Sequence, residues 1–528
     1  MKVDLVTVVT KGDVRPQDAP IGEGIFVTAL ERALAAGEID LAVHSAKDLP
    51  LDQDPGLVIA AYPERADPRD ALVTRGGESS LDALPPHAKV GTDSPRRTGF
   101  VHAIRPDLDV IPLHGNVDTR LRRLDAGEAD AIVIAAAGLD RLGFGNRIAA
   151  RLDFALMPPA PGQGALAVQA RRDDQHVLAV LRQLDDRAVR TAVVVERAVL
   201  RATGGGCRAP VGAVAVTSDD GSVMLLAGAV TTDGSSMHTL ASRLDEVHEH
   251  SLARLACRAA DELKGKVSLP ARAVVDTRPD FDPGWSGTLR QMGFRLIHVP
   301  TIAIEGSPGL ERARDRLGSY DWIVITSKRG VEALLGGRPV AAPSSVRWAA
   351  VGTSTAAALR ERGVRADVIP DIANSDAIPS AMTAHGPLRG SRVLLARADI
   401  AGDSLPERLR LEGAHVDDVV AYRTVTAPER SRQALLEALA DPDLEAIIFA
   451  SGSAVRGLVE LAEAEAGRAR GLRVFTIGPK TSAVARELGF TVTAEAATPS
   501  AAGLLTALRE GFDEEVQRWV ESQLPQRA

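Results

Sequence analysis

Cysteine and aromatic residues are scarce in this chain of 528 residues. Cys207 and Cys257 are its only cysteines, which excludes a disulfide scaffold and any four-cysteine zinc site. Phe, Trp and Tyr together make up 3% of the residues, too few for the aromatic platforms on which nucleic-acid bases stack. Each cysteine therefore has to be judged by its own surroundings.

The chain also lacks long hydrophobic runs and an excess of positive charge. Its longest apolar run, Ala131–Leu139, is far shorter than the ~18 residues of a membrane span. Asp4, Lys11 and Asp13 interrupt the first residues, where a signal peptide would need an apolar core. Lys and Arg number 62 against 70 Asp and Glu, and this net charge of −8 disfavours general nucleic-acid binding. We therefore expect a cytoplasmic protein that binds neither nucleic acid nor membranes.

Short apolar runs alternate with longer helical patterns, which is typical of α/β domains with parallel sheets. The length predicts three or more domains. In the first half, polar or basic residues follow three predicted strands, Ile39–Val43, Ala88–Gly91 and Asp130–Ala137. Ligands gather at the carboxyl ends of strands in open α/β sheets, so we expect a binding site there.

Residues 187–266 have a different pattern, and a domain boundary follows them. A helical segment leads into the Gly204–Gly206 loop, and the pattern of Val211–Leu240 predicts antiparallel strands. The pattern is reset at Pro270, where a new α/β series begins. The sequence thus predicts a small α+β domain, a short linker and a second α/β half.

The second half contains an internal repeat of strand, polar turn and helix. Its matched residues are Ser327 with Ser451, Gly352 with Gly478, and Thr355 with Thr481. Ser, Thr and Gly at helix starts expose backbone N–H groups that attract anions. Any one of them is more often a cap or a tight turn without a ligand. The matching pairs favour a binding role, because both lobes present the same chemistry.

Arginines in the first half predict a ligand with several carboxylates. Arg96 and Arg97 follow a strand and Arg120 follows a turn, and guanidinium groups suit bidentate carboxylate binding. Arg122 and Arg123 are assigned instead to an exposed helix face. No histidine or cysteine pattern in the chain predicts a metal site.

Lys47, Asp48 and Cys207 are the candidates for chemistry. Asp48, beside Lys47 at a strand end, suits general acid–base work or the stabilisation of a cation, although a plain ion pair explains the dipeptide equally well. Cys207 lies between a glycine loop and Arg208, a setting that favours a used thiol. Cys257 lies in an apolar helical stretch and is expected to fill a core.

Several long motifs carry a family resemblance. HSAKDLP, GTDSPRR, LHGNVDTRLRRLDAGEADAIVIAAAGLDRLG, PAPGQGALAVQ and ERAVLRATGGGCRAPVG occur in this order. With them, residues 1–266 resemble hydroxymethylbilane synthase, also called porphobilinogen deaminase. VVDTRP, WIVITSKRGV, AVGTSTAAAL, VVAYRT and TIGPKTSAVA make residues 271–515 similar to uroporphyrinogen-III synthase. The two families act consecutively in tetrapyrrole (heme and porphyrin) biosynthesis, so a bifunctional fusion is expected.

The first resemblance implies that four porphobilinogen units are joined into hydroxymethylbilane with release of ammonia. It implies a dipyrromethane cofactor attached covalently through Cys207, and a catalytic carboxylate at Asp48 beside Lys47. It also implies a set of residues that hold the acetate and propionate groups of cofactor and substrate: Lys47, Ser94, Arg96, Arg97, Arg120 and Arg141. Each porphobilinogen carries two carboxylates, so a growing chain needs many fixed cations.

The second resemblance implies that hydroxymethylbilane is cyclised to uroporphyrinogen III with loss of water. Tyr422 matches a tyrosine implicated in that step, and an ordinary half-buried tyrosine with a bonded hydroxyl is the alternative. The expected substrate-binding residues are the small residues at the helix starts: Thr326, Ser327, Gly352, Thr355, Ser451, Ser453, Gly478 and Thr481.

The resemblances also imply a domain plan. The deaminase region is expected to have two periplasmic-binding-like α/β domains and a small α+β third domain that carries the cofactor. The synthase region is expected to have a pair of α/β lobes with parallel sheets. The expected boundaries are residues 1–64 with 165–184, 65–164, 187–266, a linker at 267–271, lobe A at 272–303 with 424–515, and lobe B at 304–423. A monomer is expected.

Some positions depart from the deaminase pattern. The chain begins at what resembles the second strand, and Glu23 and Thr28 replace common lysines. Asp93 and Pro95 replace a serine and a leucine, and His114 replaces an arginine. Negative charge at Glu23 and Asp93 is expected to repel a polyanionic substrate.

These departures keep two alternatives open. In one, only the carboxyl-terminal synthase is active. In the other, the chain is a non-catalytic anion-binding protein, although such a protein would need neither Asp48 nor Cys207.

Overall fold

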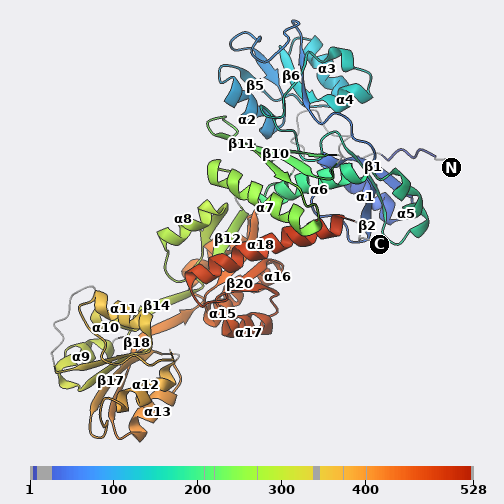
Figure 1. Ribbon diagram of the computed structural model, residues 1–528. Helices are drawn as coiled ribbons and strands as arrows, with labels where there is room; N and C mark the ends of the chain where they lie inside the picture. Colours follow the sequence, from blue (N-terminus) through green and yellow to red (C-terminus); the bar gives the residue numbers. More distant parts are fainter. Residues whose placement is uncertain are drawn as a thin grey trace. The chain divides into compact units, whose positions relative to one another are not determined.

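The computed structural model describes residues 4–8, 27–206, 209–218, 220–269, 272–307, 309–336, 345–372, 374–399 and 401–524. Cys207 and Glu23 lie outside these residues. The chain divides into two compact units, and Figure 1 labels many of their elements. Unit 1 comprises Met1–Val274, Asp282–Leu296 and Ala496–Ala528, and unit 2 comprises Val275–Phe281 and Ile297–Glu495.

The first sheet of unit 1 is antiparallel and has the strand order β1-β8-β2. Strand β1 alternates between buried and exposed side chains, which is typical of a sheet with one covered face. It lies two residues beyond the predicted strand Ile39–Val43. The elements are α1 (Val27–Ala35), β1 (Leu41–Ser45), β2 (Leu57–Ala61), β8 (Leu166–Arg171) and α5 (Gln175–Leu181).

The second sheet of unit 1 is mixed, with the order β5-β4-β6-β3-β7. Strand β4 pairs in parallel with β5 and β6, whereas β3 is antiparallel to β6 and β7. Strands β4 and β6 confirm the strands predicted at Ala88–Gly91 and Asp130–Ala137. The elements are β3 (Asp70–Thr74), β4 (Lys89–Gly91), α2 (Pro95–Ile104), β5 (Asp109–Ile111), α3 (Val117–Asp125), β6 (Ala131–Ala135), α4 (Ala136–Arg141) and β7 (Ala150–Arg151).

A three-stranded antiparallel sheet with two helices follows in unit 1, as the sequence predicts for residues 187–266. Its core gathers Val195 and Val199 of one helix, Leu225 of the sheet and Leu255 of the other helix. The elements are α6 (Arg187–Ala202), β9 (Val211–Thr217), β10 (Val223–Val230), β11 (Met237–Leu244) and α7 (Glu249–Lys266). Cys257 packs against the edge of this core, as expected.

The last helix of the chain, α18 (Ala501–Gln523), packs into the same core. Val516, Trp519 and Val520 on α18 are buried there. Figure 1 shows α18, in red, alongside the green helix α7. A helix that begins within the synthase-like region thus packs into a core of the deaminase-like region, an arrangement that the sequence does not predict. Helix α8 (Pro283–Gln291) also belongs to unit 1.

Unit 2 contains two sheets with parallel strand pairs. The first has the order β14-β18-β17-β15-β16, in which only the β14–β18 pair is antiparallel. Its elements are β14 (Ile302–Gly306), α9 (Gly309–Arg314), β15 (Trp322–Ile325), α10 (Lys328–Leu335), β16 (Arg347–Ala350), α11 (Thr353–Glu361), α12 (Ile378–Thr383), β17 (Arg392–Ala398), α13 (Ser404–Leu411) and β18 (His415–Thr426).

The second sheet has the order β13-β12-β19-β20-β21, and the ends of β12 and β13 that follow Val274 and Leu296 belong to unit 2. Strands β19, β20 and β21 are parallel. The elements are β12 (Arg272–Asp276), β13 (Phe294–His298), α14 (Arg432–Ala440), β19 (Leu444–Phe449), α15 (Gly452–Ala462), α16 (Ala466–Arg470), β20 (Arg473–Thr476), α17 (Pro479–Glu487) and β21 (Val492–Glu495).

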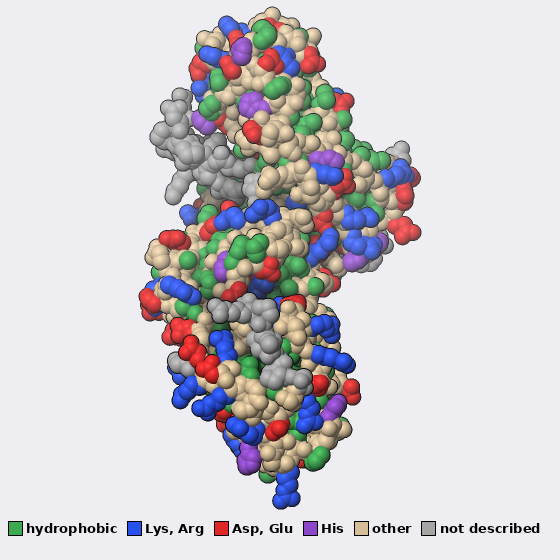
Figure 2. Space-filling model, turned by 90° about the vertical axis from the view of Figure 1, so that its left-hand side faces the viewer, with side chains coloured by type: hydrophobic (Ala, Val, Ile, Leu, Met, Phe, Trp, Pro, Cys, Tyr) green, Lys and Arg blue, Asp and Glu red, His purple; other side chains and the backbone are tan. Residues whose placement is uncertain are grey.

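The surface carries charges of both signs. On the face seen in Figure 2, Lys and Arg side chains are interspersed with Asp and Glu side chains over much of the area. Among the described residues, no helix has the length and apolar character needed to cross a membrane.

Candidate active sites

Lys47 and Asp48 lie in a short 3-10 turn, Ala46–Asp48, directly after strand β1. The Asp48 side chain is exposed, whereas Lys47 is partly buried and its Nζ donates to Oε1 of Gln163 at 3.3 Å. Burial lowers the pKa of Lys47, and the neighbouring Asp48 carboxylate opposes that effect. An accessible carboxylate thus lies beside a cation on a strand end, as the sequence predicts.

Arg96 and Arg97, at the start of α2, are buried against Asp70 at the start of β3. Nη2 of Arg96 lies 2.8 Å from Oδ2 of Asp70, and Nη2 of Arg97 lies 2.8 Å from Oδ1. Arg96 also donates to the carbonyl of Pro158 at 2.7 Å. Burial alone would raise the pKa of Asp70, but the two guanidinium groups outweigh it and lower the pKa to about 2. The two arginines therefore bond to the protein itself, and the trio keeps a net charge of +1.

Gln163 connects these groups. Its Oε1 accepts from Lys47 and, at 3.3 Å, from Nη2 of Arg97, while its Nε2 donates to Oδ1 of Asp70 at 3.0 Å. Gly164 follows in a left-handed conformation, and a Cβ there would lie 2.4 Å from the carbonyl oxygen of Ala66. The loop therefore requires glycine, and through Gln163 it places Lys47 and the Asp70 trio around one amide.

Helix α6 contacts both loops of this site, the turn at residues 46–49 and the glycine loop at residues 162–164. Arg197 is buried on α6 and donates to the carbonyls of Ala46 and Leu49, which flank Lys47 and Asp48, at 2.7 and 3.1 Å. Glu196, also buried, accepts from the backbone N–H of Gly162 at 2.7 Å. Glu196 also forms a salt bridge of 2.7 Å with Arg65, between Oε1 and Nη1. Arg65 in turn donates to the carbonyl of Gln163.

Arg120 and Arg141 contribute two further cations. Arg141, at the end of α4, donates to the carbonyl of Gly164 at 2.8 Å, so it reaches the same loop. Arg120 on α3 lies 3.1 Å from Oδ2 of Asp93, and Oδ1 of Asp93 lies 2.9 Å from Nδ1 of His114. Asp93 and His114, two departures from the family pattern, therefore contact each other. Asp93 also pairs with Arg120, which is one of the residues predicted to bind substrate carboxylates.

Ser94 and Pro95 form the start of α2. The Ser94 side chain caps the helix by accepting from the backbone N–H of Arg97. Pro95 occupies the first helical position, where its missing N–H costs nothing, so this departure from the family pattern is compatible with the helix. The predicted cofactor residue Cys207 lies outside the described residues, five positions beyond the end of α6.

In unit 2, the predicted residues lie at helix starts that follow strands. Ser327 caps α10 and Ser451 caps α15, each by accepting from the backbone N–H three residues on. Gly352 and Gly478 are the corresponding cap residues of α11 and α17. The structure thus confirms the matched strand–turn–helix units of the repeat.

The remaining predicted residues lie beside these caps. Thr355 and Thr481 are buried in the first turns of α11 and α17. Thr326 directly precedes the cap Ser327, Ser453 lies two residues after the cap Ser451, and both are partly buried.

Tyr422 lies on β18, where its hydroxyl is 3.2 Å from Oγ of Ser327. The structure therefore brings together the predicted catalytic tyrosine and one predicted binding serine. The Tyr422 ring is partly buried and packs against the core of this lobe. The geometry therefore shows a half-buried tyrosine whose hydroxyl is hydrogen-bonded.

Sequence reasoning missed Asp70, Gln163, Glu196 and Arg197, four residues that organise the first site. Signals for them exist in the sequence. Asp70 opens the apolar strand DALVT, and adjacent Glu196 and Arg197 interrupt the apolar helix around VVVERAVL. Charged residues are rarely buried without partners, so each of these positions predicts an internal contact. Gln163 stands between two glycines in the motif PGQG.

Known protein families match both halves of the chain. Residues 1–179 match the family described as porphobilinogen deaminase, dipyromethane cofactor binding domain, and residues 190–264 match porphobilinogen deaminase, C-terminal domain. Residues 284–506 match uroporphyrinogen-III synthase HemD.

Curated relatives match the first half. The chain is 48% identical over 262 residues to a porphobilinogen deaminase of Roseiflexus sp. (strain RS-1), covering 48% of this chain and 84% of the relative. It is 49% identical over 243 residues to one from Nocardia farcinica, covering 44% and 70%.

Solved structures match the second half. A mutant uroporphyrinogen III synthase from Thermus thermophilus is 20% identical with a TM-score of 0.34, covering 46% of this chain and all of that one. A uroporphyrinogen-III synthetase from Helicobacter pylori is 16% identical with a TM-score of 0.33, covering 45% and 99%. Together with the family matches, the identity to curated deaminases over most of their length places this chain in the porphobilinogen deaminase family, fused to a uroporphyrinogen-III synthase region of the same biosynthetic route.

Proposed function

We propose that the site around Lys47, Asp48 and Gln163 joins four porphobilinogen molecules into hydroxymethylbilane, and that unit 2 cyclises this product to uroporphyrinogen III. The observation that carries the first reaction is the clustering of cations around one amide, beside an exposed carboxylate. The net positive charge of the Asp70 trio, together with Arg120 and Arg141, suits substrates with two carboxylates each.

The residues fit a dipyrromethane cofactor, whose carboxylates need the same cations as the substrate. We propose that Cys207 carries this cofactor through a thioether bond and that Ser94, Arg96 and Arg97 bind or position it. When bound, the cofactor supplies the pyrrole carbon to which the first substrate is joined. Arg96 and Arg97 are already bonded to Asp70, so we assign to them mainly a fixed positive field, and to Arg120 and Arg141 direct carboxylate contacts.

Asp48 is the proton carrier of this proposal. In each condensation the C–N bond of porphobilinogen breaks and ammonia leaves. The methylene carbon then bonds to the terminal pyrrole carbon, which gives up its proton. The exposed Asp48 carboxylate would stabilise the cationic intermediates and accept that proton. Lys47, held by Gln163, orients the substrate carboxylate beside Asp48.

For the second reaction we propose that the helix starts of α10, α11, α15 and α17 bind the carboxylates of hydroxymethylbilane. The residues involved are Thr326, Ser327, Gly352, Thr355, Ser451, Ser453, Gly478 and Thr481. Tyr422, hydrogen-bonded to Ser327, donates a proton to the leaving hydroxyl, which departs as water.

The sheets suggest a domain plan, which we also propose. We propose domains at residues 1–64 with 165–184, 65–164 and 187–266, the first two of them periplasmic-binding-like. The separate sheets β1-β8-β2, β5-β4-β6-β3-β7 and β11-β10-β9 support this division. In this plan residues 267–271 link these domains to lobe A, at 272–303 with 424–515, and lobe B, at 304–423, although α8 and α18 belong to unit 1. We propose a monomer with small-molecule substrates.

Mass spectrometry of the full chain tests the first activity. We expect purified active protein to be heavier than its sequence by one dipyrromethane, with the added mass on the peptide that contains Cys207. An adduct on Cys257, or active protein with no adduct, would overturn the attachment. For the second activity, Tyr422→Phe is assayed on supplied hydroxymethylbilane, and an unchanged yield of uroporphyrinogen III would remove Tyr422 from the mechanism.

A further inference from the structure

The carboxyl-terminal end of α6 is held by residues from the second half of the chain. Arg201 lies in the last turn of α6, and its Nη2 is 2.6 Å from Oε1 of Glu515 on α18. The Arg201 guanidinium also lies over the ring of Trp519, 5.8 Å from its centroid. Nε1 of Trp519 donates to the carbonyl of Leu51 at 3.0 Å, so the same helix reaches the segment that follows Asp48.

Arg272, the first residue of β12, contacts the same end of α6 from another side. Its guanidinium donates to the carbonyl of Arg201 and stacks over Phe512 of α18, 4.6 Å from the ring centroid. A cation at the carboxyl end of a helix is favoured by the exposed carbonyls there. Arg272 is 8% exposed, so this contact is shielded from water.

The backbone at Gly204 passes close to the Arg272 side chain. It has a positive φ of 77°, and a Cβ at this position would lie 2.5 Å from Cγ of Arg272. The chain therefore leaves α6 in a direction that depends on where the Arg272 side chain lies. Three residues after Gly204 comes Cys207.

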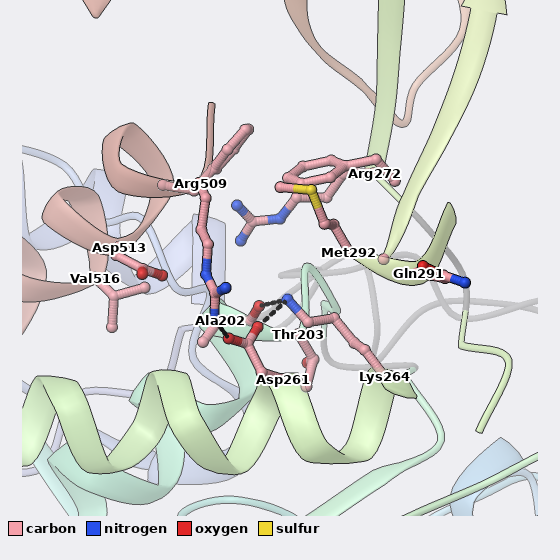
Figure 3. A pocket seen from close by; sticks show the side chains of 13 residues that line it. Ala202, Thr203, Asp261, Lys264, Arg272, Gln291, Met292, Arg509, Asp513 and Val516 are labelled. Atoms are coloured by element: carbon pink, nitrogen blue, oxygen red, sulfur yellow. Dashed lines mark hydrogen bonds and ion pairs between the residues drawn. The ribbon is translucent and has the colours of Figure 1, made fainter. Parts of the chain in front are cut away.

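A cavity of about 170 Å³ lies beside this junction and is lined by Ala202, Thr203, Arg272 and residues of α7, α8 and α18. Figure 3 shows Lys264, Arg272 and Arg509 around it. Lys264 donates to the carbonyl of Ala202 at 3.2 Å, and Arg509 pairs with Asp261. The end of α6 thus has bonded partners on α7, β12 and α18.

We propose that the synthase half of the chain positions the Gly204–Gly206 loop, which leads from α6 to Cys207 in the deaminase half. Arg272 and Glu515 are the positioning residues, because they hold the end of α6 from which this loop leaves. This inference rests on the proposed attachment of dipyrromethane to Cys207. It gives the second half of the chain a role in loading the first enzyme, in addition to its own reaction.

The rate at which the apo form of the full chain acquires dipyrromethane tests the inference. Porphobilinogen is added to apo protein, and intact mass is followed with time, well below the melting temperature of each variant. Glu515→Gln removes the ion pair to Arg201 with little change in size, and Arg272→Met removes the cation from the helix end. We expect each to slow loading at least fivefold, and Arg272→Lys, which keeps a cation there, to recover some of the lost rate.

Glu514→Gln is the matched control, because Glu514 is the exposed neighbour of Glu515 and loses the same charge. It should load at the wild-type rate, and all variants should convert supplied hydroxymethylbilane normally. Arg272 and Glu515 would be merely structural if their variants melted earlier yet loaded at the wild-type rate, and this result overturns the inference. Equal slowing in Glu514→Gln also overturns it. A wild-type adduct that is absent from Cys207 overturns the proposed attachment first, and the inference with it.

Discussion

At the residue scale, Asp48 differs from Asp70 and Glu196 because it is exposed, whereas the two other acids are buried in ion pairs. We expect Asp48→Asn to fold normally and to lower the kcat of hydroxymethylbilane formation by about a hundredfold or more, the usual range for loss of a proton-transfer group. Asp82→Asn, which removes another exposed carboxylate from unit 1, is the control. Steady-state kinetics on fully loaded protein provide the measurement, and near-normal turnover would remove Asp48 from the reaction.

Asp93 competes with the substrate for Arg120 in the proposed site. Because Asp93 lies within contact of Arg120 and His114, Asp93→Ser should release both partners, leave the Arg120 guanidinium free for substrate and remove a repelling charge. We expect the KM for porphobilinogen to fall roughly threefold or more, as a gain of somewhat under 1 kcal/mol would give. Asp118→Ser on the exposed first turn of α3 is the control. A KM that rises in Asp93→Ser would show that Asp93 instead holds Arg120 in its working position.

The low pKa of Asp70 makes the stability of unit 1 depend on pH in the acid range. Its pKa in the folded chain, about 2, lies below its usual value of 3.8. The ionised carboxylate therefore stabilises the fold above about pH 4, and this contribution of roughly 2 kcal/mol is lost as the pH falls from about 4 to 2. Asp70→Asn should unfold more easily at neutral pH and lack this component of the acid dependence. Urea unfolding from pH 2 to 6 measures the difference, and parallel curves would contradict it.

The arginines illustrate what the sequence can and cannot predict at this scale. Their positions after strand ends predict a cluster of cations, and the structure places Arg96 and Arg97 together against Asp70. The pattern does not reveal that Arg96 and Arg97 share an internal partner, because Asp70 lies far from them in the sequence and only the sheet brings them together. A guanidinium group binds a protein carboxylate and a substrate carboxylate with the same geometry.

At the element scale, α6 is the support of the first site, since Glu196 and Arg197 hold the two loops that meet there. Breaking one partner of a buried ion pair typically costs about 3–5 kcal/mol. We therefore expect Glu196→Gln to lower the free energy of unfolding of unit 1 by a few kcal/mol. Glu38→Gln, the same change at an exposed position of unit 1, should have little effect. Chemical unfolding followed by circular dichroism measures both, and equal stabilities would contradict the role of α6.

The elements of the repeat in unit 2 could be predicted, whereas the place of α18 could not. Caps such as Ser327 and Ser451 are local features, set by a polar side chain and the backbone three residues on. The partner of an amphipathic helix is a long-range feature. The apolar residues Val516, Trp519 and Val520 predict a covered face on α18, but nothing in their spacing says that α6 and α7 cover it.

At the scale of the whole molecule, the docking of α18 changes how the fusion can be taken apart. Cutting the chain at 267–271 would leave α18 on the synthase fragment and expose its binding surface on the deaminase fragment. Two separate fragments would therefore differ from the intact chain in folding as well as in tethering. Full-length chains that each lack one activity avoid this problem, because every molecule keeps the same cores.

Hydroxymethylbilane, as the family resemblance implies, closes without help to a symmetric isomer, so the second enzyme has to capture it in time. A short tether gives the second site an effective concentration that can reach roughly millimolar. We expect the intact chain to yield a larger share of the type III isomer than an equimolar mixture of Asp48→Asn and Tyr422→Phe chains, once each is shown to lack only its own reaction. The difference should grow on dilution, because in the mixture the product must diffuse to another molecule. Isomer ratios measured by chromatography across a dilution series decide the matter, and matching ratios would mean that the shared chain provides no kinetic coupling.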